Sequence, residues 1–226
     1  MDEKKEVIQE LPKKEEPKED KKEVIRENEF LNYDILFKKK VILVWGDTGS
    51  GKTSLSMNII SHLKTKKPVY VYKHPNPKLI KQIGFNNMYN ISELSRMANC
   101  VVAIDEPQLV FPIDDKKSNT FLMKLYTLAR QKDITIVLST SDSRWVTKGT
   151  ESFVNSWFVK DGEPELLKNG SRLKTIIKNN SLFGLIDFKL NVNEFLYYDR
   201  DNPEIGGRYT FKPTKFWNDD LSNPYR

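Results

Sequence analysis

The chain has 226 residues, of which 30% are charged, and a formal net charge of +6. It is long enough to bury a core without disulfide bonds, and its single cysteine, Cys100, excludes an internal disulfide. No apolar stretch approaches the roughly 20 residues that span a bilayer, and the N-terminus is charged throughout, unlike a secretory signal peptide. We therefore expect no transmembrane segment, and a protein that acts inside a cell or is carried inside a particle.

Charge divides the chain into two parts. Residues 1–29 are almost entirely Lys, Glu, Asp and Pro, with 11 acidic and 8 basic residues, so their net charge is −3 and that of residues 30–226 is +9. The first part has too little apolar content to offset the entropy of ordering, which predicts a disordered tail before one folded domain. Within the tail, residues 4–10 recur almost unchanged at 21–27, as a duplicated docking peptide or as slippage in a low-complexity gene segment.

The clearest chemical signal follows the apolar run Val41–Trp45. It has the spacing G-x-x-x-x-G-K-[ST] of a phosphate-binding loop (P-loop) behind a strand, and comprises Gly46, Asp47, Thr48, Gly49, Ser50, Gly51, Lys52 and Thr53. Backbone N–H groups of such a loop, and of the helix that follows it, bind phosphate oxygens. Lys52 can reach the β- and γ-phosphates, and the Thr53 hydroxyl can complete a Mg²⁺ shell.

Strands and helices alternate after the loop. Leu55, Ile59 and Leu63 recur at helical spacing, and the following patterns predict, in order, a strand over 68–72, helical segments over 77–83 and 92–99, a strand over 100–104, a helix over 118–130 and strands over 134–138 and 153–159. Phe195–Tyr198 and Arg208–Phe211 predict a closing β-hairpin. This order indicates an α/β fold with a central, mostly parallel sheet and with phosphate chemistry at the carboxyl ends of its strands.

Two carboxylates follow the strand at 100–104. Four buried apolar residues before Asp105 form the pattern that holds Mg²⁺ in P-loop enzymes. Glu106, in the next position, can orient or deprotonate an attacking water. A whole strand, Val69–Tyr72, lies between the loop and this pair, an insertion that suits ATPases with an additional central strand bearing the catalytic Glu. We therefore predict Mg²⁺-dependent ATP hydrolysis.

The next strand and the helix before it carry further candidates. Thr140 and Ser141 at the tip of the strand would lie beside the γ-phosphate and report its presence. Arg130, at the end of the helix, could reach the nucleotide of a neighbouring subunit as an arginine finger, or be favoured there only by the helix dipole. Arg144 and Arg172 are competing candidates for the finger.

The segment Leu128–Ser141, in which an Arg precedes a strand with a polar end, resembles the FtsK–HerA superfamily of DNA-pumping ATPases, and Asp105-Glu106 fits the same family. Segments 206–209 and 216–225 are similar to the tail of its small viral branch, the genome-packaging ATPases of icosahedral, internal-membrane viruses, including archaeal ones. The resemblance covers residues 38–226. This family usually has Gln where this chain has Ser141, so we divide the sensing role between Thr140 and Ser141.

The resemblance implies a homo-oligomeric ring, expected to be a hexamer, that uses ATP and Mg²⁺ to drive double-stranded DNA into a capsid. It would dock on a capsid or vertex protein, either in the virion or in the host cytoplasm. Basic residues between 166 and 186 could line the pore or form a solvated face, and the loop 107–117 is a rival pore or partner element.

Other functions stay open at this point. A phage-assembly ATPase or a HerA-like DNA-processing motor would use the same site. A nucleotide-dependent switch would need a guanine-reading Asn-Lys-x-Asp motif, which does not occur in this sequence. A small-molecule kinase would need an Arg-rich lid, but residues 139–150 contain only one arginine, Arg144. The sequence identifies neither the ring size nor the adenine-reading residues.

Overall fold

The computed structural model describes residues 29–109, 111, 116–141, 152–160, 190–216 and 221. Its strands are β1 (Glu29–Phe30), β2 (Val41–Trp45), β3 (Val69–Tyr72), β4 (Asn86–Met88), β5 (Val101–Asp105), β6 (Thr135–Thr140), β7 (Ser156–Val159), β8 (Glu194–Asp199) and β9 (Gly207–Thr210). Its α-helices are α1 (Lys52–Leu63), α2 (Pro77–Gln82) and α3 (Lys116–Gln131), and shorter 3₁₀ turns are η1 (Tyr33–Lys38), η2 (Ile91–Arg96), η3 (Pro107–Leu109) and η5 (Pro203–Ile205).

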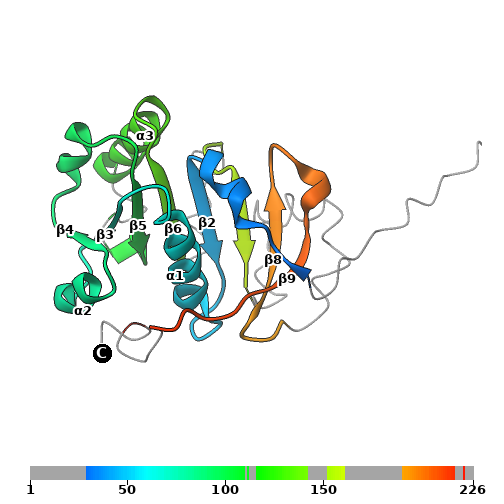
Figure 1. Cartoon of the computed structure of the whole chain (residues 1–226). Helices are drawn as coiled ribbons and strands as arrows, with labels where there is room; N and C mark the ends of the chain where they lie inside the picture. The colour runs from blue at the N-terminus through cyan, green and yellow to red at the C-terminus, as the bar shows by residue number, and fades with distance from the viewer. Residues whose placement is uncertain are drawn as a thin grey trace, which may run out of the picture.

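The described strands form one nine-stranded sheet in the order β1-β9-β8-β7-β2-β6-β5-β3-β4 (Figure 1). All pairs from β7 to β4 are parallel, whereas β8 is antiparallel to both β7 and β9. The fold is therefore the expected mostly parallel α/β sheet closed by a C-terminal hairpin. Because the hairpin reverses direction twice and β1 runs parallel to β9, the ends of β1, β9 and β7 lie at the same edge as those of β2, β5 and β6. We call this edge, at the bottom of Figure 1, the carboxyl edge.

Helices cover both faces of the sheet, which explains why its central strands are apolar at every position. All five residues of β2 are buried. Successive side chains of a strand point to opposite faces, and accordingly Val41, Leu43 and Trp45 pack with α3 and η2, while Ile42 and Val44 pack with α1 and α2. The expected helix contacts are present. Leu55, Ile59 and Leu63 of α1 are completely buried, and Leu125 and Ala129 of α3 are at most 1% exposed.

The strand between the P-loop strand and the Asp-Glu strand differs from the one that sequence order suggested. Val69–Tyr72 is a strand, β3, but it lies beyond β5, on the side away from β2. The strand that separates β2 from β5 is β6, which follows both in the chain. The additional central strand is thus β6, whose polar tip lies between the P-loop and Glu106, whereas Glu106 itself follows the next strand, β5.

Several sequence predictions fall outside the described residues. These are the tail up to residue 28, Arg144, Arg172, the basic segment 166–186 and all of 217–226 except Leu221. Within the part of the chain that the structure describes, no helix is long and apolar enough to cross a bilayer.

Candidate nucleotide-binding site

The P-loop lies at the carboxyl edge, between β2 and α1. Gly49 and Gly51 have φ values of 85° and 90°, in the left-handed region that side chains with a Cβ avoid. Gly51 also has little room for a side chain, since a Cβ there would lie 3.0 Å from a backbone atom, the carbonyl oxygen of Val192. Both glycines are therefore required by the backbone path that aims the loop and the first turn of α1 at a ligand.

Lys52 is the first residue of α1 and is only 6% exposed. Its Nζ donates a hydrogen bond to the carbonyl oxygen of Asp47, at 2.8 Å, and lies 3.9 Å from Oε1 of Glu106. Burial lowers the pKa of Lys52, against the opposing effect of the nearby carboxylates of Glu106, Asp105 and Asp47. Lys52 is thus held inside the loop, next to the residue that we expect to activate water.

Asp105 ends β5 and lies opposite Ser139 of β6. Its Oδ1 is buried and has no hydrogen-bond partner among the described residues, and burial raises the pKa of the carboxyl group to about 6. An acceptor oxygen held without a donor fits a cation, and Thr53 in the first turn of α1 offers a second hard oxygen. The described residues contain no cluster of three or more His, Cys, Asp or Glu, but Mg²⁺ needs only one or two protein oxygens beside phosphate and water.

Glu106 turns away from the line of β5. Its φ of 43° is unusual for a residue other than glycine, and such strain concentrates at functional sites. Its backbone N–H donates to the carbonyl oxygen of Ser139, at 2.8 Å. Its Oε2 accepts bonds from the Ser141 hydroxyl, at 3.2 Å, and from the Ser141 N–H, at 3.3 Å. The carboxylate is therefore fixed between Lys52 and the tip of β6.

Gln108 is a site residue that the sequence analysis missed. Its Nε2 donates to Oε2 of Glu106, and its Oε1 accepts a bond of 2.9 Å from the Thr140 hydroxyl. Gln108 thereby joins both expected sensor positions, Thr140 directly and Ser141 through Glu106. The available signal was an amide two residues beyond Glu106, in a loop that we had assigned to a pore or a partner.

Lys160 is a second missed residue. It follows β7, is 1% exposed, and donates from Nζ to the carbonyl oxygens of Val192, at 2.6 Å, and Glu194. Its Cε lies 3.6 Å from the position that a Cβ of Gly51 would take. The buried lysine therefore packs against the P-loop backbone and ties it to the segment before β8.

Arg130 does not lie near the P-loop of its own chain. It is exposed near the end of α3, where the N–H of Asn99 donates to the carbonyl oxygen of Lys132, at 2.9 Å. That bond places the end of α3 beside the start of β5, at the edge of the sheet opposite the P-loop. A role for Arg130 in hydrolysis thus requires a second subunit.

No protein-family model and no curated protein sequence matches this chain. Its structure is similar to that of the genome-packaging NTPase B204 of Sulfolobus turreted icosahedral virus 2 bound to ATP-gammaS, with a TM-score of 0.58, 17% identity, and coverage of 81% of this chain and 99% of B204. B204 from Sulfolobus turreted icosahedral virus gives a TM-score of 0.59 with 17% identity, over 78% of this chain and 98% of that one.

The chain has the fold of a P-loop NTPase. The likeness extends to the pCW3 conjugation coupling protein TcpA, with a TM-score of 0.53, 17% identity, and coverage of 84% of this chain and 64% of TcpA. The fold implied by the resemblance to viral packaging ATPases is therefore confirmed, with the P-loop, Asp105 and Glu106 at the carboxyl edge where that fold binds nucleotides.

Proposed function

We propose that this protein is a Mg²⁺-dependent ATPase that translocates double-stranded DNA and packages it into a viral capsid. The observation that carries the proposal is the placement of Glu106, whose Oε1 lies 3.9 Å from Nζ of the P-loop Lys52. A base beside the lysine that holds the terminal phosphates can act on the water that attacks them. The fold shared with B204, a genome-packaging NTPase, supports the assignment of the motor to packaging.

The two carboxylate oxygens of Glu106 have different tasks in this proposal. Oε2 accepts the shorter bonds, from Ser141 and Gln108, which fix the plane of the carboxylate. Oε1 faces Lys52 and takes the proton of the attacking water. Lys52 and the N–H groups of residues 46–53 hold the β- and γ-phosphates, and Thr140 and Ser141 sense the γ-phosphate through the same network. Asp105 and Thr53 would hold Mg²⁺, which neutralises charge on the phosphate oxygens when bound.

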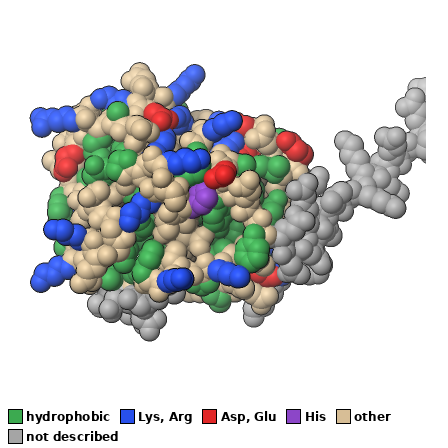
Figure 2. Space-filling model, viewed as in Figure 1, with side chains coloured by type: hydrophobic (Ala, Val, Ile, Leu, Met, Phe, Trp, Pro, Cys, Tyr) green, Lys and Arg blue, Asp and Glu red, His purple; other side chains and the backbone are tan. Residues whose placement is uncertain are grey.

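Assembly into a homo-oligomeric ring, which we expect to be a hexamer, would bring Arg130 to a neighbouring nucleotide as the trans-acting finger. DNA would bind through its phosphates without sequence preference, because residues 30–226 carry a net charge of +9. Lys and Arg side chains are distributed over the whole face seen in Figure 2, with a few acidic ones between them, so this face offers no single basic stripe. We therefore keep the pore, rather than this surface, as the DNA site, with a capsid or vertex protein as the docking partner.

A second candidate keeps the ATPase and changes its task. The fold is also shared with TcpA, a conjugation coupling protein, and with EssC from Geobacillus thermodenitrificans, at a TM-score of 0.52 and 9% identity. A DNA-processing or assembly motor of the same superfamily would use the same P-loop, Asp105 and Glu106. The two candidate functions differ in the polymer that would stimulate ATP hydrolysis.

The test measures ATP hydrolysis by the full chain with and without duplex DNA over a series of salt concentrations. A DNA motor is stimulated by the duplex, and the stimulation fades as salt rises. Lys52→Ala and Glu106→Gln should each lower turnover by roughly 100-fold or more, while the exposed controls Lys78→Ala and Glu204→Gln should leave it unchanged. Undiminished turnover in both site variants would refute the site, and hydrolysis that is indifferent to duplex DNA at every salt concentration would refute the motor.

A further inference from the structure

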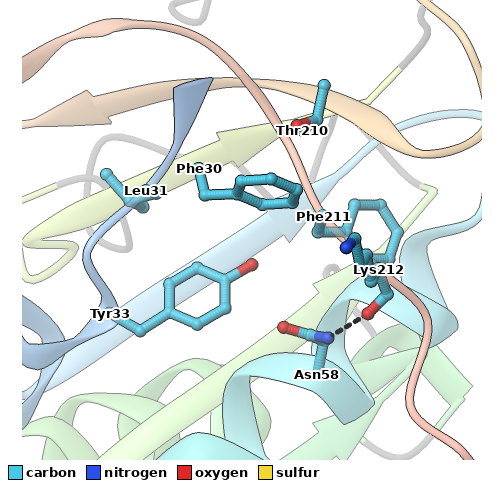
Figure 3. Close-up of a pocket in the computed structure, with 7 residues that line it drawn as sticks. All are labelled: Phe30, Leu31, Tyr33, Asn58, Thr210, Phe211 and Lys212. Carbon is cyan, nitrogen blue, oxygen red and sulfur yellow. Dashed lines mark hydrogen bonds between the residues drawn. The ribbon is translucent and has the colours of Figure 1, made fainter. Parts of the chain in front are cut away.

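A cavity of about 380 Å³ opens beside α1, between β1 and the chain that follows β9 (Figure 3). Its volume lies in the range of roughly 300–1,000 Å³ that is typical of small-molecule sites. Phe30 ends β1 and Thr210 ends β9, so the cavity lies at the carboxyl edge. This is the edge that carries the P-loop.

The cavity lies close to the P-loop. Asn58, which lines it, is six residues along α1 from Lys52, or roughly 9 Å along the helix axis. Phe211, another lining residue, has its ring centroid 5.0 Å from Nζ of Lys160, the lysine that packs against Gly51. One buried side chain therefore separates the cavity from the phosphate-binding backbone, which is a distance that a nucleoside spans.

The cavity also lies on the appropriate side of the P-loop. In the sheet, β9 and β1 lie on one side of β2, whereas β6 and β5, with Glu106 at their tips, lie on the other. A nucleotide whose terminal phosphate faces Glu106 can extend its nucleoside the other way, toward β9. The position of the cavity follows from strand order and does not depend on the resemblance to any other protein.

The lining of the cavity matches a flat aromatic ligand with polar edges. Phe30 is 60% exposed although it belongs to the sheet, and its ring and those of Tyr33 and Phe211 border the cavity. The exposed ring of Phe30, with Nζ of Lys212 at 5.4 Å from its centroid, can stack on a base, whereas Phe211 is only 3% exposed and forms a buried wall. Figure 3 shows the three rings around one space, with Asn58 of α1 at its lower side.

Two polar side chains, Tyr33 and Asn58, line the cavity. The Tyr33 hydroxyl is buried and has no hydrogen-bond partner among the described residues. The Nδ2 of Asn58 donates to the carbonyl oxygen of Lys212, at 2.5 Å, which fixes the amide and directs its acceptor oxygen to the opposite side (Figure 3). An acceptor at that position suits the exocyclic amine of adenine, whereas guanine carries an oxygen at the corresponding position.

We propose that the cavity formed by Phe30, Tyr33, Asn58 and Phe211 binds the adenine base of the nucleotide whose phosphates occupy the P-loop. This inference rests on the proposed function only in requiring a nucleoside triphosphate on residues 46–53. It assigns stacking to Phe30 and base selection to Asn58.

The test measures by calorimetry how tightly the full chain binds ATP-gammaS, GTP-gammaS and inorganic tripolyphosphate in the presence of Mg²⁺. Phe30→Ala should weaken binding of ATP-gammaS by about tenfold, because one stacking partner is lost, and leave tripolyphosphate binding unchanged. Tyr89→Ala is the matched control, since Tyr89 is also 60% exposed but lies beyond β4, at the far end of the sheet. Asn58→Leu should reduce the preference for ATP-gammaS over GTP-gammaS.

Unchanged tripolyphosphate binding shows that Phe30→Ala is folded with an intact P-loop, so the ATP-gammaS result decides the proposal. Equal affinity of Phe30→Ala and the native chain for ATP-gammaS would overturn the stacking site, and equal affinity of the native chain for the two nucleotides would overturn adenine selection. Lys52→Ala separates this outcome from failure of the proposed function. If Lys52→Ala retains full affinity for both ATP-gammaS and tripolyphosphate, the P-loop proposal itself fails.

Discussion

Gln108 connects the tip of β6 to the carboxylate that we expect to activate water. Its amide bonds both Thr140 and Glu106, so it orients the base without itself contacting a phosphate. Gln108→Ala should lower kcat by roughly 10- to 100-fold, because a hydrogen bond to a charged group is lost, and change KM for ATP little. Steady-state kinetics measure both constants, with Gln131→Ala, an exposed glutamine at the end of α3, as the control. A variant that raises KM and leaves kcat unchanged would assign Gln108 to nucleotide binding instead.

Cys100 is the other residue whose environment makes a direct prediction. It is 1% exposed, and burial raises the pKa of its thiol to about 11. The thiolate is the reactive form, so an aromatic disulfide reagent at about pH 8 should not modify the native protein and should modify it fully after unfolding in urea. The absorbance of the released thiolate measures both rates. Rapid modification of the native protein would show that this edge of the core opens readily.

The positions of the candidate site residues were predictable where their spacing is local in the sequence. Lys52, Asp105 and Glu106 stand at fixed spacings after apolar strands, so motif and strand end together locate them. Gln108 and Lys160 were not predictable, because their roles arise from contacts across the sheet: Gln108 bonds Thr140, 32 positions away, and Lys160 bonds Val192, also 32 positions away. No periodicity encodes such contacts.

At the scale of the elements, a buried ion pair joins β8 to the chain that enters β2. Asp199 is completely buried and accepts bonds from Nζ of Lys39 and from the Tyr197 hydroxyl, both at 2.7 Å. Asp199→Leu should lower the free energy of unfolding by about 3–5 kcal/mol, because Lys39 would stay buried near one remaining, half-exposed carboxylate, Asp201. Urea unfolding followed by circular dichroism measures the change.

The double variant Lys39→Met/Asp199→Leu is the control for that prediction. It removes both charges, so it should recover most of the lost stability if the cost comes from an unpaired buried charge. A double variant as unstable as Asp199→Leu would instead assign the cost to packing or to the groups that Asp199 also bonds, which are the N–H groups of Asp201 and Asn202 and the Tyr197 hydroxyl. A loss below about 1 kcal/mol in the single variant would show that Asp201 alone satisfies the lysine.

The strands that the sequence predicted best are the ones that are buried on both faces. Apolar runs located β2, β5 and β6, since each is covered on both faces. The runs could not locate β1 or β4, which have two and three residues and lie at the sheet's edges, where Asn86 and Asn87 are tolerated. Nor could they show that β6, rather than β3, separates β2 from β5, because strand order depends on tertiary packing.

At the scale of the whole molecule, the position of Arg130 means that it can act on a nucleotide only from a neighbouring chain. The residue is exposed at the edge opposite the P-loop, so removing it leaves the P-loop, Asp105 and Glu106 of the same subunit intact. Lys52→Ala has the complementary defect, with an inactive P-loop and an intact Arg130. The two variants can therefore restore each other only if the finger acts between subunits.

Arg130→Ala alone should lose ATP turnover, since an arginine finger contributes roughly 10³–10⁵-fold. When it is co-expressed in equal amounts with Lys52→Ala, about a quarter of the interfaces in a head-to-tail ring pair an intact P-loop with an intact Arg130. Turnover of the mixed rings should return toward that fraction of the native value. Mixed rings of Lys52→Ala and Glu106→Gln provide the control and should stay inactive, because every P-loop in them is disabled within its own chain. If mixed Arg130→Ala and Lys52→Ala rings show no turnover at any ratio, Arg130 is excluded as the finger. The same mixing experiment would then test the other candidates with Arg144→Ala and Arg172→Ala.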